Sequence, residues 1–255
     1  IDSNGSNIMS KIFNSIKKGV LLEDLCHVRQ GMRTGIDRVS DSHINKIDSS
    51  LVKGDGVFIL SVEEIEKLKI DKNDTLVKPL FKNSDINKYF SNTTENQYLL
   101  YIDNSIELED LKRNHLPIYN HLSKYKKTIS TIRDKNNENN DDWFRLDRPR
   151  EKWLFEGEKI VAPQRSRSNK FAYNDISWYA SADVYFIKQK SKDVSLKYIL
   201  ALLNSKLYYY WLLNKGKRKG DMLELYQKPL SEIPIVESKE FTKHIETIID
   251  YILII

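Results

Sequence analysis

The amino-acid sequence predicts an α+β fold, in which helices pack on an antiparallel or mixed sheet and a helical segment ends the chain. Three apolar segments separated by turns, residues 159–162, 171–173 and 183–187, have the pattern of an antiparallel sheet rather than of βαβ repeats. Stretches on either side repeat apolar residues at helical spacing, which predicts amphipathic helices. The chain has 255 residues, of which 40% are hydrophobic, so it can form one sizeable domain.

The first predicted elements lead into a turn with two glycines. Apolar residues in the segment 8–16 lie on one helical face, and we expect Gly19 to end this short helix. Residues 25–30 are expected to form a strand. This strand runs into a polar, cationic turn that contains Gly31 and Gly35, where special backbone angles are expected.

Two further strands and a helix are predicted between the glycine turn and the middle of the chain. Residues 57–60 and 98–102 are both expected to be strands. Ser61 and Glu64 have the spacing of a capping box, in which each side chain bonds the other residue's backbone N–H. A helix should therefore begin there and run to about Lys69.

The second half of the chain contains the longest helical patterns. Residues 118–132 are predicted to form one amphipathic helix, followed by an exposed polar loop at residues 136–140. Ser195 can cap a helix that is expected to run to about Asn214. A last amphipathic helix is expected from about Lys239.

These elements divide the chain into three parts. Residues 1–19 are expected to be a linker and a short helix from an upstream domain, residues 20–236 the main domain, and residues 237–255 a C-terminal helix. The chain opens on Ile1 and not on methionine, so we expect it to be a piece of a longer polypeptide.

Composition indicates the compartment and the classes of partner. The net charge is +5 and the isoelectric point is about 8.9, so only clustered charge would indicate a polyanionic partner. Cys26 is the single cysteine, which excludes an internal disulfide and fits a reducing cytosol. No apolar run reaches the roughly 18 residues that span a bilayer, and no signal peptide opens the sequence. We expect a cytoplasmic protein without a membrane partner.

The sequence lacks the usual motifs of a catalytic site. Neither the dinucleotide-binding G-x-G-x-x-G motif nor a phosphate-binding P-loop occurs, and the five histidines have no zinc-ligand spacing. We therefore expect no catalytic residue, metal or cofactor in this chain. A small metal-dependent nuclease that uses Asp141, Asp142 or Glu158 remains an alternative, although paired acids in a polar segment are usually solvated charge.

Two short basic segments stand out against the mild overall charge. The first, residues 165–170, lies between two predicted strands, and the second, residues 215–220, is bracketed by glycines and expected to be a flexible loop. Arginine and asparagine side chains read base edges in nucleic acids, whereas lysine commonly contacts phosphate. Aromatic residues lie beside both segments, and these belong either to the core or to a base-stacking surface. The segments indicate contact with a nucleic acid. The simpler alternative is that these cationic residues only keep the protein soluble.

Each basic residue receives an expected role on these grounds. Three arginines and the asparagine are candidates to read base edges, whereas three lysines, one arginine and one hydroxyl of the glycine turn are candidates to contact phosphate. The candidate base readers are Arg33, Arg165, Arg167 and Asn169, and the candidate phosphate contacts are Thr34, Lys170, Lys217, Arg218 and Lys219.

A protein–protein docking or assembly module is the alternative from another functional class. It would use the apolar face formed by Ile8, Ile12, Phe13 and Ile16 together with the last helix. Association that does not depend on salt, without DNA binding, would favour it.

The order of several short motifs resembles the TaqI-like C-terminal specificity domain of N6-adenine DNA methyltransferases and fused type II restriction-modification enzymes. The motifs, in order, are residues 31–37 (GMRTGID), 77–80 (VKPL) with 85–86 (DI), 143–146 (WFRL), 159–163 (KIVAP), 202–206 (LLNSK) and 233–235 (IPI).

The resemblance implies a division of labour. This chain would recognise a sequence in double-stranded DNA, while an upstream methyltransferase domain of the same polypeptide would bind S-adenosylmethionine and methylate adenine. The chain lacks the Asn-Pro-Pro-aromatic motif of that catalytic domain. The resemblance thus implies a recognition domain that has no activity of its own.

Overall fold

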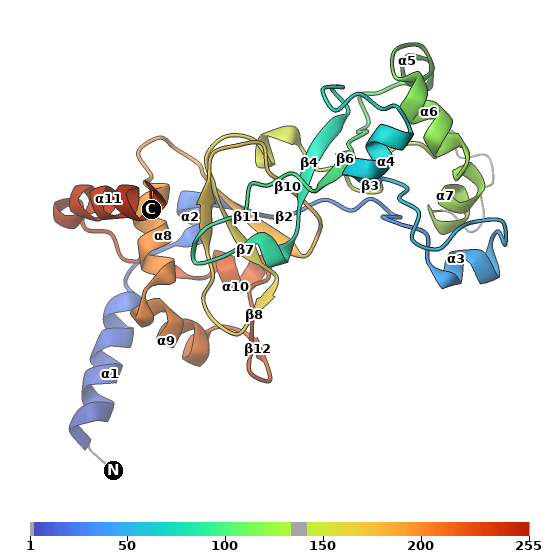
Figure 1. Ribbon diagram of the computed structural model, residues 1–255. Helices are drawn as coiled ribbons and strands as arrows, with labels where there is room; N and C mark the ends of the chain where they lie inside the picture. The colour runs from blue at the N-terminus through green and yellow to red at the C-terminus, as the bar shows by residue number, and fades with distance from the viewer. Residues whose placement is uncertain (1–2, 134–141, 255) are drawn as a thin grey trace.

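The computed structural model describes residues 3–133 and 142–254. It has mixed helix and sheet content, so the predicted α+β class is confirmed. Figure 1 shows strands β2, β7 and β11 in the middle of the molecule, with α4, α5, α6 and α7 at one end and α1, α8, α9 and α11 at the other. The loop predicted at residues 136–140 lies outside the described residues.

The central sheet has five strands, in the order β2-β11-β7-β9-β5. Its neighbours pair in antiparallel fashion, except that β9 and β5 are parallel. The three strands predicted from turns and apolar runs are therefore found, as β7, β9 and β11. The bounds are β2 Cys26–Gln30, β5 Tyr89–Phe90, β7 Lys159–Pro163, β9 Ala172–Asn174 and β11 Val184–Gln189.

Both faces of this sheet are buried, against two different hydrophobic cores. Successive side chains of a strand point to opposite faces. In β11, Phe186 accordingly packs in one core and Ile187 in the other, and Val161 and Ile160 of β7 divide in the same way. Because both faces are covered by apolar residues, the strand reads as a continuous apolar run instead of an alternating one.

The first core also holds a second, four-stranded sheet in the order β10-β4-β6-β3. Helices α4 to α7 accompany this sheet, and the short helix α3 lies at the same end of the molecule (Figure 1). The bounds are β3 Ile59–Ser61, β4 Val77–Phe81, β6 Gln97–Leu100, β10 Tyr179–Ala180, α3 Asp41–Lys46, α4 Val62–Lys67, α5 Leu108–Asn114, α6 Leu116–Ser123 and α7 Lys126–Arg133.

The second core is formed by the two ends of the described chain and the helices that follow β11. A two-stranded pairing of β1 with β14 joins these ends, and α11 packs on α8. The bounds are α1 Ser3–Ile16, β1 Val20–Leu21, α2 Leu22–Leu25, α8 Leu196–Asn204, α9 Lys206–Lys215, α10 Gln227–Ser231, β14 Pro234–Ile235 and α11 Lys239–Ile254.

Two helices that the sequence predicts as continuous are interrupted. The helix expected at 118–132 is α6 followed by α7, and the helix expected to begin after Ser195 is α8 followed by α9. Ser205 separates the second pair: its backbone is extended, and its hydroxyl accepts a hydrogen bond from the Tyr208 N–H to begin α9. Apolar residues keep helical spacing across the break, so spacing alone does not reveal it.

The single cysteine is part of the second core. Cys26 is buried, and this burial raises the pKa of its thiol to about 12. The thiol is therefore protonated at neutral pH and lacks the thiolate character that reactive cysteines need. Among the described residues, no helix is long and apolar enough to cross a membrane.

Candidate nucleic-acid interface

A small three-stranded sheet brings the two basic segments of the sequence together. Strand β8 (Arg165–Ser166) pairs with β13 (Met222–Glu224), and β13 pairs with β12 (Arg218–Lys219), all in antiparallel fashion. Figure 1 shows β8 and β12 together on one side of the molecule, next to α9 and α10. Residues about fifty positions apart in the sequence thus lie on one small sheet, which we call the basic sheet. Its register puts Arg165 and Lys219 on one face and Arg218 on the other.

The second basic segment is not the flexible loop that the flanking glycines suggested. Arg218 and Lys219 form a paired strand, and Gly220 makes the turn to β13 with a φ of +62°. That angle favours glycine because a Cβ atom is strained there. Both cationic side chains are exposed. The hairpin presents them on a fixed backbone, which reduces the ordering cost when a ligand binds.

One carboxylate organises the middle of the basic sheet. Glu224 is only 7% exposed, and its oxygens lie 3.1 Å from Lys217 Nζ and 3.4 Å from Arg165 Nη2. Burial raises the pKa of Glu224, but the Lys217 hydrogen bond and the neighbouring cations outweigh it, so the net shift is downward. The carboxylate is therefore ionised at neutral pH and neutralises part of the positive charge around it.

An aromatic ring fixes the same two cations. Arg165 Nη2 donates to the Tyr226 hydroxyl at 2.6 Å, and its guanidinium carbon lies 5.7 Å from the ring centroid. Lys217 Nζ lies 5.1 Å from that centroid. Such contacts hold a cation in place without neutralising it. Sequence reasoning missed both Glu224 and Tyr226, because the pairing of β8 with β13 that brings them beside Arg165 has no local signal.

The remaining candidates of the first basic segment differ widely in exposure. Arg167 is 81% exposed, with its Nε 3.2 Å from a carboxylate oxygen of Asp221. A pair this exposed contributes at most about 1 kcal/mol, so the guanidinium can exchange Asp221 for another acceptor. Lys170 is partly buried.

Asn169 is the least exposed of these candidates, at 5%. Its amide nitrogen donates to the carbonyl oxygens of Leu203, at 2.7 Å, and Ser205, at 2.9 Å, where α8 ends. The adjacent Asn204 side chain exchanges two hydrogen bonds with the backbone of Phe171. Both asparagines therefore fasten the first basic segment to the junction of α8 and α9.

The aromatic residues beside the basic segments belong mainly to the core. Phe171, Tyr208 and Trp211 are all buried, and the Tyr208 hydroxyl donates to the carbonyl oxygen of Pro234. Tyr210 is exposed. The geometry therefore favours the structural reading of the tyrosine run over a base-stacking surface.

The glycine turn forms a second polar surface, where the chain leaves β2. A Cβ at Gly31 would lie 2.3 Å from the Ser181 carbonyl oxygen, and Gly35 has a φ of +91°, so each position requires glycine for a different reason. Arg33 is about half exposed, with its Nε 3.6 Å from Asp147. Thr34 is buried, and its hydroxyl donates to Asp37. The turn therefore presents Arg33 and hides Thr34.

Residues 78–235, more than half of the chain, match the family described as the TaqI-like C-terminal specificity domain. The chain belongs to this family. The resemblance based on the ordered sequence motifs is thereby confirmed, although the matched region begins after the glycine turn.

Curated relatives of this specificity domain are type II methyltransferases. It is 30% identical over 213 residues to M.MjaIV of Methanocaldococcus jannaschii, an alignment that covers 79% of this chain and 70% of the relative. It is 37% identical over 82 residues to M.HincII of Haemophilus influenzae, covering 30% of this chain and 16% of that relative.

Solved structures of restriction-modification enzymes share the fold of the specificity domain. The type IIL enzyme MmeI, whose structure was determined in complex with DNA, matches with a TM-score of 0.60 and 15% identity over 91% of this chain. The type IIG restriction endonuclease BpuSI matches with a TM-score of 0.52 and 12% identity over 95% of this chain. The specificity domain spans 28% of each of these two enzymes.

The acids considered for a nuclease are engaged by the specificity domain itself. Asp142 accepts a hydrogen bond from Arg145, and Glu158 accepts one from the Tyr173 hydroxyl at 2.7 Å. Asp141 lies outside the described residues. Within residues 3–133 and 142–254, no group of three or more His, Cys, Asp or Glu residues is arranged to hold a metal ion.

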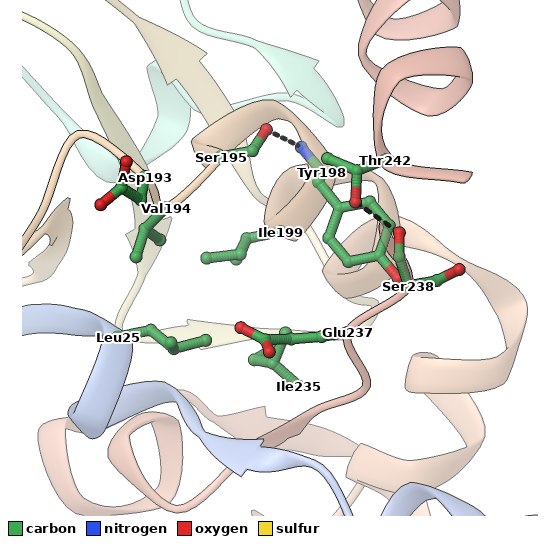
Figure 2. Close-up of a pocket in the computed structure, with 10 residues that line it drawn as sticks. All are labelled: Leu25, Asp193, Val194, Ser195, Tyr198, Ile199, Ile235, Glu237, Ser238 and Thr242. Atoms are coloured by element: carbon green, nitrogen blue, oxygen red, sulfur yellow. Dashed lines mark hydrogen bonds between the residues drawn. The ribbon is translucent and has the colours of Figure 1, made fainter. Parts of the chain in front are cut away.

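An apolar hollow of about 340 Å³ lies between the beginning of α8 and the segment that leads into α11. Figure 2 shows Leu25, Ile199 and Ile235 around it, with the carboxylate of Glu237 among them and that of Asp193 at its edge. Among the side chains that the structure describes, none of those lining this hollow is basic. Its chemistry differs from that of the basic sheet and suits an apolar or cationic group.

The two surfaces considered for protein docking, on α1 and α11, are covered by the rest of the protein to different degrees. Ile16 is buried, and Ile12 and Phe13 pack partly against the second core, so much of the apolar face of α1 is covered within the specificity domain. Helix α11, by contrast, exposes several large apolar side chains, namely Phe241, Ile248, Tyr251, Ile252 and Ile254.

Proposed function

We propose that this chain recognises the target sequence in double-stranded DNA on behalf of a DNA methyltransferase, or of a methyltransferase fused to an endonuclease. One observation carries the proposal: in a chain of the specificity-domain family, β8 and the β12–β13 hairpin gather five cationic residues in the strands of one small sheet or directly beside them. These residues are Arg165, Arg167, Lys217, Arg218 and Lys219. Clustered cations of this kind neutralise phosphate and release counterions from the duplex.

Within this proposal, the exposed arginines read base edges and the hairpin cations contact phosphate. Arg165, Arg167 and Arg33 can each offer paired N–H donors, the geometry that matches guanine in the major groove. Lys217, Arg218 and Lys219, with Lys170, contact the backbone. The burial of Asn169 and Thr34 supports structural roles for these two residues, which hold the recognition surface in place.

The chemistry belongs to a second domain in this proposal. An upstream methyltransferase domain of the same polypeptide would bind S-adenosylmethionine and transfer its methyl group to N6 of an adenine. Taking a base out of the duplex costs a few kcal/mol of stacking and pairing. Contacts between the specificity domain and both strands beside the target would offset that cost. Recognition and methylation would then take place at the same DNA site.

The test is selection of bound sequences from a randomised duplex DNA pool at several salt concentrations. We expect one short motif to be enriched, with affinity falling steeply as salt rises. Replacing Arg165 or Arg167 with alanine should cost roughly 1–3 kcal/mol at one base position and leave the others unchanged. Arg113→Ala, at an exposed arginine of α5, is the matched control.

The outcomes distinguish a domain that recognises a DNA sequence from one that binds DNA of any sequence. Retention without a motif would leave a DNA clamp whose specificity needs the catalytic domain, and an unchanged motif in both arginine variants would reject these two readers. Absence of binding even at low salt would reject DNA recognition by this chain.

The exposed apolar face of α11 supports a second candidate function, association with another protein or domain. Five large exposed apolar side chains on one described helix exceed what isolated surface positions usually show. Salt-insensitive self-association in sedimentation analysis, abolished by Phe241→Ser with Tyr251→Ser, would support this function. A monomer at all concentrations would exclude self-association.

A further inference from the structure

A second cationic site adjoins the basic sheet. A hollow of about 600 Å³ lies between the end of α9 and helix α10. Its floor is apolar, and three lysines stand around it. The floor includes Trp211, Leu212, Pro229 and Ile233, and the lysines are Lys215, Lys217 and Lys228.

The charges of these lysines are largely available to a ligand. In the part of the chain that the structure describes, Lys215 has no ion pair. Lys228 is 83% exposed and lies 3.7 Å from the Glu232 carboxylate, a surface pair that solvent and salt screen strongly. Lys217 shares Glu224 with Arg165. Three lysines against one exposed and one shared carboxylate leave a positive hollow, which suits an anion.

The aromatic residues of the hollow do not offer a platform for a base. Arg165 and Lys217 already lie over the Tyr226 ring, and Trp211 is buried. A nucleobase that stacks needs an uncovered ring face. The remaining groups are ammonium donors, which contact phosphate as point charges. The chemistry therefore favours a phosphate group over a base.

The position of the hollow connects it to the basic sheet. Lys217 and Tyr226 line the hollow and also contact Arg165 and Glu224 on that sheet. A duplex backbone lying along β12 can therefore continue into the hollow. We propose that Lys215 and Lys228 bind phosphate groups of the duplex that flanks the recognised bases. This inference rests on the proposed DNA-recognition function.

The experiment compares duplexes that carry the selected motif with short or long flanking sequence. In the Lys215→Gln/Lys228→Gln double variant we expect roughly tenfold weaker binding to the long duplex and a salt slope smaller by about two. The preferred motif should stay unchanged, and the short duplex should bind as in the original protein. Lys67→Gln/Lys192→Gln, at two exposed lysines away from the hollow, is the charge-matched control.

The outcomes distinguish failure of the proposed phosphate site from failure of the proposed DNA recognition. Equal affinity and salt slope for the double variant and the original protein on the long duplex would overturn the phosphate site while leaving DNA recognition intact. A changed motif in the double variant would also overturn it, since phosphate contacts carry no base information. Failure of the original protein to bind any duplex would reject the proposed function and this inference together. Thermal unfolding of both variants verifies that they fold.

Discussion

At the scale of single residues, Glu224 determines how much of the basic sheet is available to an anion. The carboxylate is nearly buried and contacts both Arg165 and Lys217. A phosphate that binds these cations has to compete with it. The carboxylate thus sets the geometry of the cations and at the same time weakens their attraction for DNA.

Replacing Glu224 with glutamine should separate these two effects. Without the negative charge, affinity for DNA of random sequence should rise at low salt, and the salt slope should become steeper by about one. Thermal stability should fall, because two cations lose a nearly buried partner. Fluorescence anisotropy over a salt series measures the slope, and Glu66→Gln, which removes a surface partner of Lys72, is the control. An unchanged slope would show that Glu224 does not compete with phosphate.

Lys159 provides a test of a buried charge in the central sheet. Its side chain is fully buried, and its Nζ donates to the carbonyl oxygens of Gly157 and Ile176. Burial, with some repulsion from Lys188, lowers the pKa of the Lys159 ammonium to about 7. Between this value and the ordinary one of 10.5, the unfolded chain binds a proton at Lys159 that the folded protein does not.

The contribution of Lys159 to the free energy of unfolding should therefore rise with pH over that range. Relative to Lys159→Met, the original protein should gain stability between about pH 7 and pH 10, by at most roughly 4 kcal/mol. Urea unfolding of both proteins at several pH values measures the difference, in which other titrating groups cancel. A difference that stays constant with pH would mean that Lys159 keeps its proton on folding.

Residue type alone could predict only part of the candidate site. Arg165, Arg167 and Lys217 were selected from local charge, and the structure places them on one surface. Asn169 and Thr34 have side chains equally suited to contact DNA, yet both are buried. Burial depends on what packs over a residue. Asn169 is covered by the α8–α9 junction, which lies more than thirty residues further along the chain, whereas Thr34 is buried within its own turn, where it bonds Asp37.

At the scale of elements, the α8–α9 junction holds the first basic segment in place. Asn204 is fully buried, with its Oδ1 accepting from the Phe171 N–H at 3.1 Å and its Nδ2 donating to the Phe171 carbonyl at 2.8 Å. These bonds join the end of α8 to the end of the first basic segment. The break at Ser205, which helical spacing did not predict, thus has a structural use: it leaves the carbonyl oxygens of Leu203 and Ser205 free to accept hydrogen bonds from the Asn169 amide.

Replacing Asn204 with alanine should weaken both the fold and the reading of sequence. Leaving the buried backbone groups of Phe171 without partners should cost roughly 1–3 kcal/mol of stability. The segment that carries Arg165 and Arg167 should become less well ordered, so the preference among DNA sequences should fall more than total binding. Chemical unfolding and sequence selection measure the two effects. Asn214→Ala, at an exposed asparagine that bonds within its own helix, should change neither.

At the scale of the whole molecule, the central sheet joins two cores that the sequence predicted only in part. The apolar runs of β7, β9 and β11 revealed three of its strands, because their length and flanking turns are local properties. The pairing of Gln30 with Tyr185 places β2 beside β11 across more than 150 residues, and no local pattern specifies it. The α+β class followed from the elements, whereas the division into two cores depends on these long-range pairings.

The internal carboxylate of the basic sheet has a further consequence for how the protein finds its target. A genome offers a very large excess of wrong sites, and strong charge attraction to all of them would hold the protein there. Because Glu224 remains paired with Arg165 and Lys217 until a better acceptor arrives, dwell times on unrelated sequence should be short. Base contacts at the correct site would then supply the difference. The carboxylate would thus lower the affinity for unrelated DNA and shorten the time needed to find the target.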